Sequence, residues 1–274
     1  MAVLETHGIA QYYETHGDPA NPPVLLIAGL GGTGASWASQ IHRFAERYFV
    51  LVPDQRGTGR STHAADGHTT AQLAADLIDL LDFLSVSPAH VVGSSTGGAI
   101  AQHIVLARPD LARSLTLASS FARFDAFMRR EFDVRRRLAA EWDRRSLMSA
   151  YALFLFSPRF AHEHPDRVEE WIDRASSTPA EPRDIEIALK RIDMIAEHDT
   201  HARLGEIDTP TLVLSGTSNA CTTLPNSEIL ATAIRGARLV TYDQAGELIE
   251  IERADEFFAA VSEFIDSVTS TRDT

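Results

Sequence analysis

Apolar and polar positions along this chain fall into blocks that predict strands separated by single helices. Residues 24–28 (VLLIA) and 49–53 (FVLVP) are short, continuous apolar runs, which are typical of strands buried on both faces of a sheet. Leucines recur at helical spacing from residue 73 to residue 84, after a Thr-Thr-Ala-Gln capping pattern that begins at Thr69. Further strands are expected at residues 114–119, 211–215 and 238–242. This alternation predicts a mostly parallel sheet with helices on both faces.

The alternation stops from about residue 121 to residue 200, where the pattern is helical throughout and rich in aromatic residues. Proline breaks divide this segment at Pro158, Pro165, Pro179 and Pro182. Helices inserted between two strands predict a lid over the strand ends, and a purely structural subdomain is the alternative. We therefore expect an α/β core from residues 1–120 and 201–274, and a helical lid from residues 121–200.

A Gly-x-Ser-x-Gly motif occupies residues 93–97, between a predicted strand at 89–92 and a predicted helix from residue 99. The two glycines remove Cβ atoms that would clash in a tight strand–turn–helix connection. Such a turn holds the Ser95 hydroxyl exposed on strained backbone, with the Thr96 N–H beside it to stabilise an oxyanion. The motif therefore predicts a nucleophile elbow, and a glycine-rich turn with an idle serine is the alternative.

Charge and cysteine content narrow the class of protein. The formal net charge of −13 argues against a nucleic-acid surface or an anionic-membrane patch. Residues 123–145 are locally rich in arginine, but interleaved acidic residues favour a solvated helical face. The single cysteine, Cys221, excludes an internal disulfide and a multi-cysteine metal site, and we expect it to be a small buried side chain.

No secretory signal and no membrane-spanning apolar run is evident, so a cytoplasmic location is expected. We expect a small-molecule substrate, and no metal, cofactor, nucleic acid or membrane partner. A homodimer is left open.

With these features in place, the chain resembles the α/β-hydrolase fold over almost its whole length. The elbow, the glycine turn at residues 28–34 and the sequence DQRGTGRS at residues 54–61 occur in the order and at the spacing of that family. Within the family the chain is most similar to the branch of the aminoacrylate hydrolases of pyrimidine breakdown. Residues 28–34, residues 54–59, FDVRRRL at 132–138 and LFLF at 153–156 carry this closer resemblance. It implies an α/β fold with a doubly wound, mostly parallel eight-stranded sheet and an inserted helical lid.

The resemblance also implies roles for individual residues. Ser95 would be the nucleophile, and the N–H groups of Leu30 and Thr96 would form the oxyanion hole. An acid is expected in the loop after residues 211–215, and a histidine just after the strand that ends at Tyr242.

The sequence departs from the family at these last two positions. Asn219 stands where the family usually carries an aspartate, and Glu247 stands where it has a histidine. No histidine follows His201, and Ser94 stands where the family often has another histidine. The loss matters because a serine hydroxyl is a poor nucleophile until a base takes its proton. An unperturbed carboxylate, with a pKa of about 4.3, is a weak base for that task.

The two replacements nevertheless fit each other. Glu247 beside Asn219 carries one negative charge, as a neutral histidine beside an aspartate does, and the Asn219 amide can donate to Glu247 or accept from its protonated form. We therefore predict a remodelled acid–base site of Ser95, Glu247 and Asn219. A base supplied by His198 or His201, and an acid supplied by Asp125, are the alternatives.

Three functions follow from these predictions. The first is a non-hydrolytic acid–base reaction on the carbonyl group of a small, largely apolar substrate, such as a cyclisation, isomerisation, elimination or C–C bond reaction. Ser95 would then hydrogen-bond the substrate rather than become acylated. The second is hydrolysis of an ester, lactone or enamine with Ser95 as the nucleophile, and the third is ligand binding without catalysis.

Overall fold

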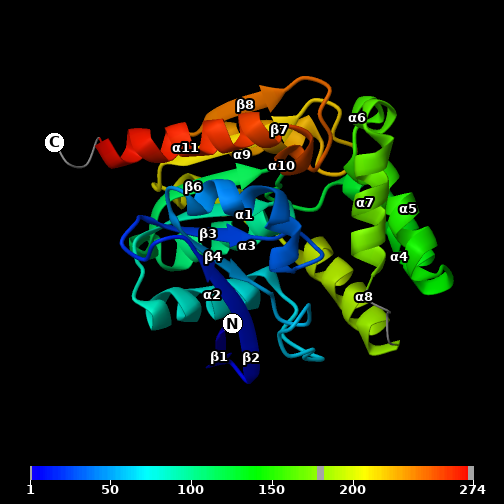
Figure 1. Ribbon diagram of the computed structural model, residues 1–274, viewed down its shortest axis with the longest axis horizontal. Coiled ribbons are helices and arrows are strands. Elements are labelled where there is room, and N and C mark those ends of the chain that lie inside the picture. The colour runs from blue at the N-terminus through cyan, green and yellow to red at the C-terminus, as the bar shows by residue number, and fades with distance from the viewer. Residues whose placement is uncertain (1, 178–181, 271–274) are drawn as a thin grey trace.

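The computed structural model describes residues 2–177 and 182–270, which surround one central sheet (Figure 1). Its strands are β1 (Ala2–Thr6), β2 (Ile9–His16), β3 (Pro23–Ile27), β4 (Phe49–Pro53), β5 (Ala89–Ser94), β6 (Ala112–Ala118), β7 (Thr211–Gly216) and β8 (Arg238–Tyr242). They lie in the order β1-β2-β4-β3-β5-β6-β7-β8. β2 pairs antiparallel with β1 and with β4, and the pairs from β4 to β8 are parallel. The predicted doubly wound, mostly parallel eight-stranded sheet is confirmed.

The continuous apolar run of β3 is explained by a core on each face of the sheet. Leu25 and Ile27 pack into one buried cluster, whereas Val24 and Leu26 pack into another. All four side chains are fully buried. Because successive side chains of a strand point to opposite faces, a strand covered on both sides must be apolar at consecutive positions.

Helices cover both faces of the sheet (Figure 1). They are α1 (Ala38–Ala45), α2 (Thr70–Leu84), α3 (Thr96–Ala107), α9 (Leu224–Ala233), α10 (Ile249–Glu252) and α11 (Ala254–Ser270), with the 3-10 turns η1 (Gly34–Trp37), η2 (Pro109–Leu111) and η3 (His201–Glu206). Side chains of α2, α3 and α9 pack in the cluster that contains Leu25, and those of α1 and α11 in the cluster that contains Val24. Within the described residues, no helix is both long and apolar enough to cross a membrane.

Helix α2 begins where the capping pattern predicts. The Thr69 hydroxyl accepts a hydrogen bond from the Gln72 N–H at 3.0 Å, which satisfies one of the free amides at the helix start. Leu73, Leu77 and Leu80 are buried against the sheet, as their helical spacing predicts.

The chain between β6 and β7 forms a helical segment at one end of the sheet (Figure 1). Its helices are α4 (Ala126–Glu141), α5 (Arg144–Leu155), α6 (Pro158–Glu163), α7 (Pro165–Ser176) and α8 (Pro182–Glu197). Proline is the first residue of α6, α7 and α8, where its fixed φ suits the helix and its missing N–H has no role in the helix ladder. The predicted break at Pro179 lies outside the described residues.

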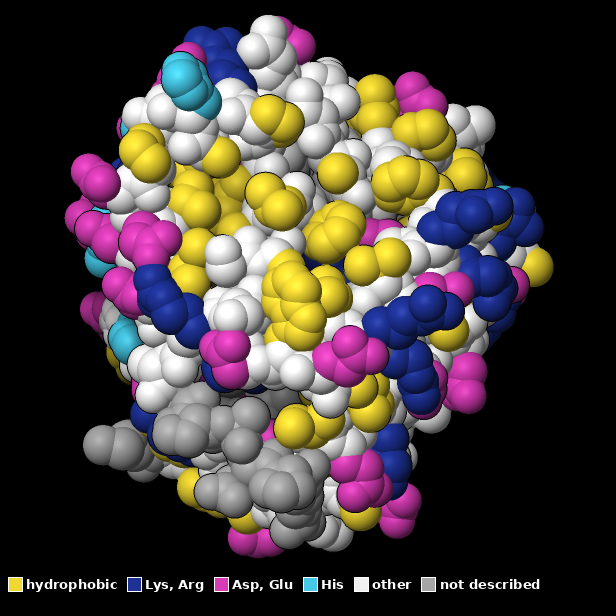
Figure 2. Space-filling view, turned by 90° about the vertical axis from the view of Figure 1, so that its right-hand side faces the viewer, with side chains coloured by type: hydrophobic (Ala, Val, Ile, Leu, Met, Phe, Trp, Pro, Cys, Tyr) yellow, Lys and Arg dark blue, Asp and Glu magenta, His cyan; other side chains and the backbone are white. Residues whose placement is uncertain are grey.

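Figure 2 shows the face of the molecule on which this segment lies, where apolar side chains gather among charged ones. The large apolar side chains of the segment that remain exposed are Phe127, Val134, Trp142, Leu153 and Ile185. Other apolar side chains of the segment, among them Leu147, Met148, Phe156, Phe160 and Ile172, form a buried cluster, so the segment has a mixed outer face and a core of its own.

Candidate active site

Ser95 lies in a strained turn between β5 and α3. Its φ of 53° and ψ of −120° are unusual for a residue with a side chain, and they mark a turn that the surrounding structure must hold in place. A Cβ on Gly97 would lie 2.2 Å from the Ile27 carbonyl oxygen, and one on Gly93 would lie 2.4 Å from the Gly97 carbonyl oxygen. Both positions therefore require glycine, as the motif predicts. The Ser95 N–H donates to the Ala118 carbonyl oxygen at 2.8 Å, which ties the turn to the end of β6.

The glycine turn after β3 lies directly against this serine. A Cβ on Gly29 would lie 3.3 Å from the Ser95 Cβ and 3.9 Å from the Ser95 Oγ. Leu30, the next residue, is thereby brought beside the serine. Thr96 is the first residue of α3, so its N–H has no acceptor within the helix ladder. Leu30 and Thr96 are thus the residues that directly follow Gly29 and Ser95, the two residues that meet here.

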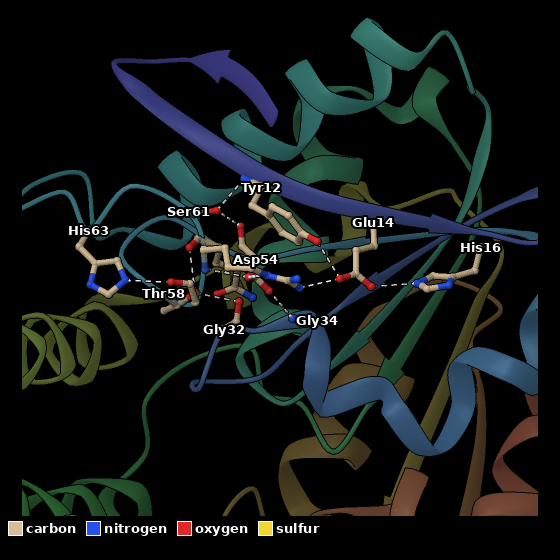
Figure 3. Close-up of polar contacts among 12 residues, drawn as sticks. Tyr12, Glu14, His16, Gly32, Gly34, Asp54, Thr58, Ser61 and His63 are labelled. Carbon is tan, nitrogen blue, oxygen red and sulfur yellow. Dashed lines mark hydrogen bonds and ion pairs between the residues drawn. The ribbon is translucent and has the colours of Figure 1, made fainter. Parts of the chain in front are cut away.

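The loop of residues 54–61 braces the glycine turn (Figure 3). The Asp54 carboxylate accepts the Gly34 N–H at 2.8 Å, and the Thr58 hydroxyl donates to the Gly32 carbonyl oxygen at 2.9 Å. The Gln55 side chain donates to the Ala28 carbonyl oxygen at 2.7 Å. This motif therefore acts by positioning the backbone of the turn that faces Ser95.

Glu247 is buried, with 1% of its surface exposed, and is held by the loop that follows β7. Its Oε2 accepts a hydrogen bond from the Asn219 Nδ2 at 2.7 Å and lies 2.6 Å from the Thr222 hydroxyl. The Thr222 N–H also points to Oε2, at 3.3 Å. The two residues that replace the family's aspartate and histidine are thus in direct contact.

The second oxygen of Glu247, Oε1, is buried and has no hydrogen-bond partner. The Ser119 hydroxyl donates to the Glu247 carbonyl oxygen at 2.7 Å, and the Ser120 hydroxyl donates to the Ser95 carbonyl oxygen at 2.9 Å. Ser119 and Ser120, which directly follow β6, therefore hold Glu247 and Ser95 at the carboxyl end of this strand. Oε1 is therefore the oxygen of Glu247 that forms no hydrogen bond with the described residues.

Arg191 connects helix α8 to the glycine turn, and the sequence analysis missed it. Its side chain is 2% exposed and donates to the carbonyl oxygens of Leu30 at 3.0 Å and Arg56 at 3.2 Å, and to the Gln55 side chain at 2.5 Å. None of these three partners is a carboxylate. Burial lowers the pKa of Arg191 to about 10. The oxyanion side of the site is therefore backed by a buried cation whose partners are neutral.

Ser94 faces a different acid, Glu250. The Ser94 hydroxyl donates to the Glu250 Oε1 at 3.1 Å, and the Glu250 Oε2 is buried without a partner. Burial is the main cause that raises the pKa of Glu250 to about 7, and the charge of Glu247 adds to it. Ser94 thus belongs to a second buried polar pair beside the elbow.

Asp125 and His198, the alternative acid and base, form hydrogen bonds with other residues. Asp125 caps α4 by accepting the Met128 N–H at 2.8 Å, and its other oxygen accepts from the Asn226 side chain at 3.0 Å. The His198 Nδ1 lies 3.0 Å from the Thr70 hydroxyl, and its ring packs edge-on against Phe121. Burial is the main cause that lowers the pKa of His198 to about 3. These contacts connect neither residue to Ser95 or Glu247.

The expectation of a solvated helical face over residues 123–145 is wrong for Glu131 and Arg135. These residues are 5% and 3% exposed, and the Arg135 Nε lies 2.7 Å from the Glu131 Oε1. They share one face of α4 with the buried Met128 and Phe132, at spacings of three and four residues. That spacing is the signal that could have indicated their burial, because apolar neighbours on the same helix face mark the side that packs inward.

The Glu131 carboxyl group lies beside the acid loop. Its pKa is raised to about 7, mainly by burial; Arg135 opposes the rise, and the charge of Glu247 contributes to it. Cys221 is fully buried next to it, as expected for a small side chain, and burial raises the pKa of its thiol. The site is therefore rich in carboxyl groups, and within the described residues no three histidine, cysteine or acidic side chains are grouped to hold a metal ion.

The sheet, the elbow and the glycine turn define the class as an α/β-hydrolase. A family model described as "alpha/beta hydrolase fold" matches residues 22–254, and the chain belongs to that family. It is 35% identical over 246 residues to a protein of Azorhizobium caulinodans named "Putative carbamate hydrolase RutD", covering 90% of this chain and 91% of that protein. A protein of the same name from Variovorax paradoxus is 31% identical over 262 residues, covering 94% and 97%.

Solved structures of hydrolases are similar over nearly the whole chain. An enol-lactonase from Burkholderia xenovorans has a TM-score of 0.86 and 26% identity, covering 97% of this chain and 100% of that one. A hydrolase from Pseudomonas aeruginosa has a TM-score of 0.85 and 28% identity, covering 96% and 97%. The resemblance to the α/β-hydrolase family is confirmed, and the chain is an enzyme of that family. The comparisons favour hydrolysis and do not support the non-hydrolytic reaction that was expected first.

Proposed function

We propose that this enzyme hydrolyses a small carboxyl derivative, such as a carbamate, ester or lactone, with Ser95 as the nucleophile and Glu247 as the base. The observation that carries the proposal is the state of the Glu247 carboxyl group. It is buried, its Oε2 is held by Asn219 and Thr222, and its Oε1 has no hydrogen-bond partner. The backbone carbonyls of Glu247 and Ser95 accept from the neighbouring hydroxyls of Ser119 and Ser120. The names of the similar hydrolases support the reaction class.

The steps follow from these groups. The Ser95 Oγ attacks the carbonyl carbon while its proton passes to the Glu247 Oε1, and the N–H groups of Leu30 and Thr96 stabilise the oxyanion. Collapse of the tetrahedral intermediate breaks the bond to the leaving group, which takes the proton from Glu247. Water then attacks the acyl group with Glu247 again as the base, which regenerates Ser95 and releases the acid.

Asn219 has a positioning role in this proposal. Its Oδ1 accepts the N–H groups of Cys221 and Thr222, so its amide nitrogen faces Glu247. A donor at Oε2 stabilises the ionised carboxylate and fixes its direction, while the lone pairs of Oε1 stay free. In many enzymes the hydrogen bond between nucleophile and base tightens only in the substrate complex.

Hydrolysis of 4-nitrophenyl acetate and labelling by an alkyl fluorophosphonate test the proposal. We expect Ser95→Ala to abolish both, with the label found on Ser95 by mass spectrometry. Glu247→Gln, which keeps the size of the side chain, should lower kcat by about 10²- to 10⁴-fold. Ser36→Ala, at an exposed serine, is the control. Full turnover by the Glu247→Gln variant, with activity lost in His198→Gln instead, would place the base elsewhere and overturn the assignment.

A non-hydrolytic acid–base reaction remains the second candidate, because Glu247 replaces the imidazole on which serine hydrolysis usually depends. In that reaction Glu247 moves a proton and Ser95 only donates a hydrogen bond to the substrate. A stoichiometric acyl group on Ser95 after mixing with an activated ester would exclude it.

We also propose that residues 121–200 act as a lid over a small-molecule site that uses no cofactor. Contacts from two of its helices support this role: the Leu155 carbonyl oxygen, at the end of α5, accepts the Glu247 N–H at 3.0 Å, and Arg191 of α8 reaches Leu30. The cytoplasmic location expected from the sequence stays a prediction.

A further inference from the structure

Glu131 and Arg135 form a buried polar pair on the inner face of α4. They are one helical turn apart, and both side chains are more than nine-tenths buried. The Arg135 guanidinium lies over the rings of Tyr151 at 4.8 Å, Phe132 at 5.1 Å and Phe154 at 5.4 Å. A charged pair buried among aromatic rings has lost its hydrogen bonds to water, and the rings replace few of them.

Polar atoms of this pair remain without regular hydrogen bonds. The Nη2 of Arg135 is buried without a hydrogen bond. The Glu131 carboxylate forms an ion pair with the Arg135 Nε at 2.7 Å and interacts with the Cys221 thiol, but its two oxygens have further lone pairs that accept nothing. Buried polar groups are nearly always satisfied, because an unsatisfied one carries its full cost of desolvation. The pair thus offers both an acceptor and a donor to a third group.

The pair faces the proposed catalytic site. Cys221 lies next to Glu131, and the Cys221 N–H donates to the Asn219 Oδ1 at 2.9 Å. Glu131 and Arg135 each interact electrostatically with Glu247. Phe132, between them on α4, packs in the same apolar cluster as Cys221 and Leu30. A group bound at this pair would therefore belong to a substrate that also reaches Ser95.

We propose that Glu131 and Arg135 form a subsite for a neutral amide, urea or carbamate group of the substrate, distinct from the carbonyl that Ser95 attacks. Arg135 Nη2 donates to the carbonyl oxygen of that group, and the Glu131 carboxylate accepts its N–H. The inference rests on the proposed function, because it assigns a substrate feature to the same site.

The charges of the cluster favour a neutral group over an anion. Glu131 and Glu247 are two acidic groups against the single guanidinium of Arg135. A substrate carboxylate placed here would add a third acid and raise the pKa of Glu131, already about 7, still further. An amide edge presents a donor and an acceptor side by side and matches the pair without adding charge. A site built to hydrogen-bond a substrate group discriminates strongly against an analogue that lacks it, because its own polar groups are then left unpaired.

Three 4-nitrophenyl esters with acyl chains of equal length test the subsite. The pentanoate has neither polar group, the 4-oxopentanoate has the carbonyl only, and the N-acetylglycinate has both carbonyl and N–H. We expect kcat/KM to rise in that order, by about tenfold or more overall.

The double variant Glu131→Leu with Arg135→Leu replaces the pair by apolar side chains, a change that folded proteins often tolerate. We expect the three values of kcat/KM to converge in this variant, because none of the esters can then form the two hydrogen bonds.

The exchange variant E131R/R135E keeps the ion pair but reverses donor and acceptor, so it should also lose the preference while its melting temperature stays close to that of the wild type. Equal preference in the wild type and the double leucine variant would overturn the proposal. Binding is tested separately with N-methylacetamide and N,N-dimethylacetamide, by NMR titration of the Ser95→Ala variant. Preferred binding of N-methylacetamide that is lost in the leucine variant supports the subsite even if no ester is hydrolysed, in which case the proposed function alone fails.

Discussion

The Asn219 Nδ2 donates a hydrogen bond to the Glu247 Oε2 at 2.7 Å, and this contact fixes both the orientation of the amide and the role of the carboxylate. The Asn219 Oδ1 already accepts the N–H groups of Cys221 at 2.9 Å and Thr222 at 3.1 Å, so only the NH₂ group can face Glu247. The Oε2 is therefore an acceptor, and a proton taken up by Glu247 must go to Oε1.

Asn219→Asp tests this relationship. The variant keeps the acceptor for the two backbone N–H groups but replaces the donor by a second carboxylate, so one of the two acids must hold a proton at neutral pH. We expect kcat/KM at pH 7 to fall at least about tenfold, and the free energy of unfolding to fall by about 2 kcal/mol. A pH–rate profile and urea unfolding measure the two effects. Asn21→Asp, in a turn away from the site, is the control, and an unchanged Asn219→Asp variant would contradict the assigned hydrogen bond.

Gly97→Ala and Gly31→Ala test whether glycine is required in the elbow and in the neighbouring glycine turn. A Cβ on Gly97 would lie 2.2 Å from the Ile27 carbonyl oxygen, whereas one on Gly31 would have no heavy atom within 4 Å. We expect Gly97→Ala to lose about 3 kcal/mol or more of stability, and Gly31→Ala to stay within about 1 kcal/mol of the wild type. Thermal and urea unfolding measure the stability of both variants. Equal stability of the two variants would show that the backbone of the elbow can move aside.

Arg191→Met tests whether α8 holds the oxyanion side of the site. The change leaves the carbonyl oxygens of Leu30 and Arg56 and the Gln55 side chain without their donor, so we expect a loss of about 2 kcal/mol in stability. We also expect about a tenfold lower kcat with little change in KM, because the Leu30 backbone is proposed to stabilise the transition state. Lys190→Met, at the partly exposed neighbour that pairs with Glu186, should change stability by no more than about 0.5 kcal/mol. Equal effects of the two variants would show that Arg191 does not hold the glycine turn in place.

His198 makes stability depend on pH in the acid range. Burial lowers its pKa from 6.5 to about 3, so the unfolded chain binds the proton more readily than the folded one between these values. The contribution of the neutral His198 ring to the free energy of unfolding is fully present above pH 6.5. It is lost as the pH falls toward 3, by about 1.4 kcal/mol per pH unit. His90, with a pKa lowered to about 4, adds to this loss. Glu131, with a pKa raised from 4.5 to about 7, acts in the opposite sense, because its folded form binds the proton more readily between these values.

His198→Phe keeps an aromatic ring against Phe121 but cannot titrate. Urea unfolding between pH 4 and pH 7 should show a smaller slope of stability against pH than the wild type, and His162→Gln, at an exposed histidine, should leave the slope unchanged. An unchanged slope in the phenylalanine variant would show that His198 is not buried as a neutral ring.

Much of the site could be anticipated from short stretches of sequence. The glycines around Ser95 and the apolar run before Gly29 are local features, and each dictates a backbone geometry that few other arrangements share. The contact between Asn219 and Glu247 could be anticipated only in part. Their chemistry suggested a pair, but the roles of Thr222 as a further donor and of Oε1 as the free atom depend on how two loops 28 residues apart meet.

By itself the sequence determined the α/β-hydrolase family, the order of its strands and helices, and the elbow, because consecutive apolar runs, caps and glycine positions act through neighbours in the chain. Only the tertiary structure decided which charged side chains lie inside. Glu131, Arg135 and Arg191 look like ordinary charges on polar helices, and they are buried because the inner faces of α4 and α8 pack against the rest of the chain. The spacing of Met128 and Phe132 marks the inner face of α4, but only long-range packing removes water from the charged side chains on that face.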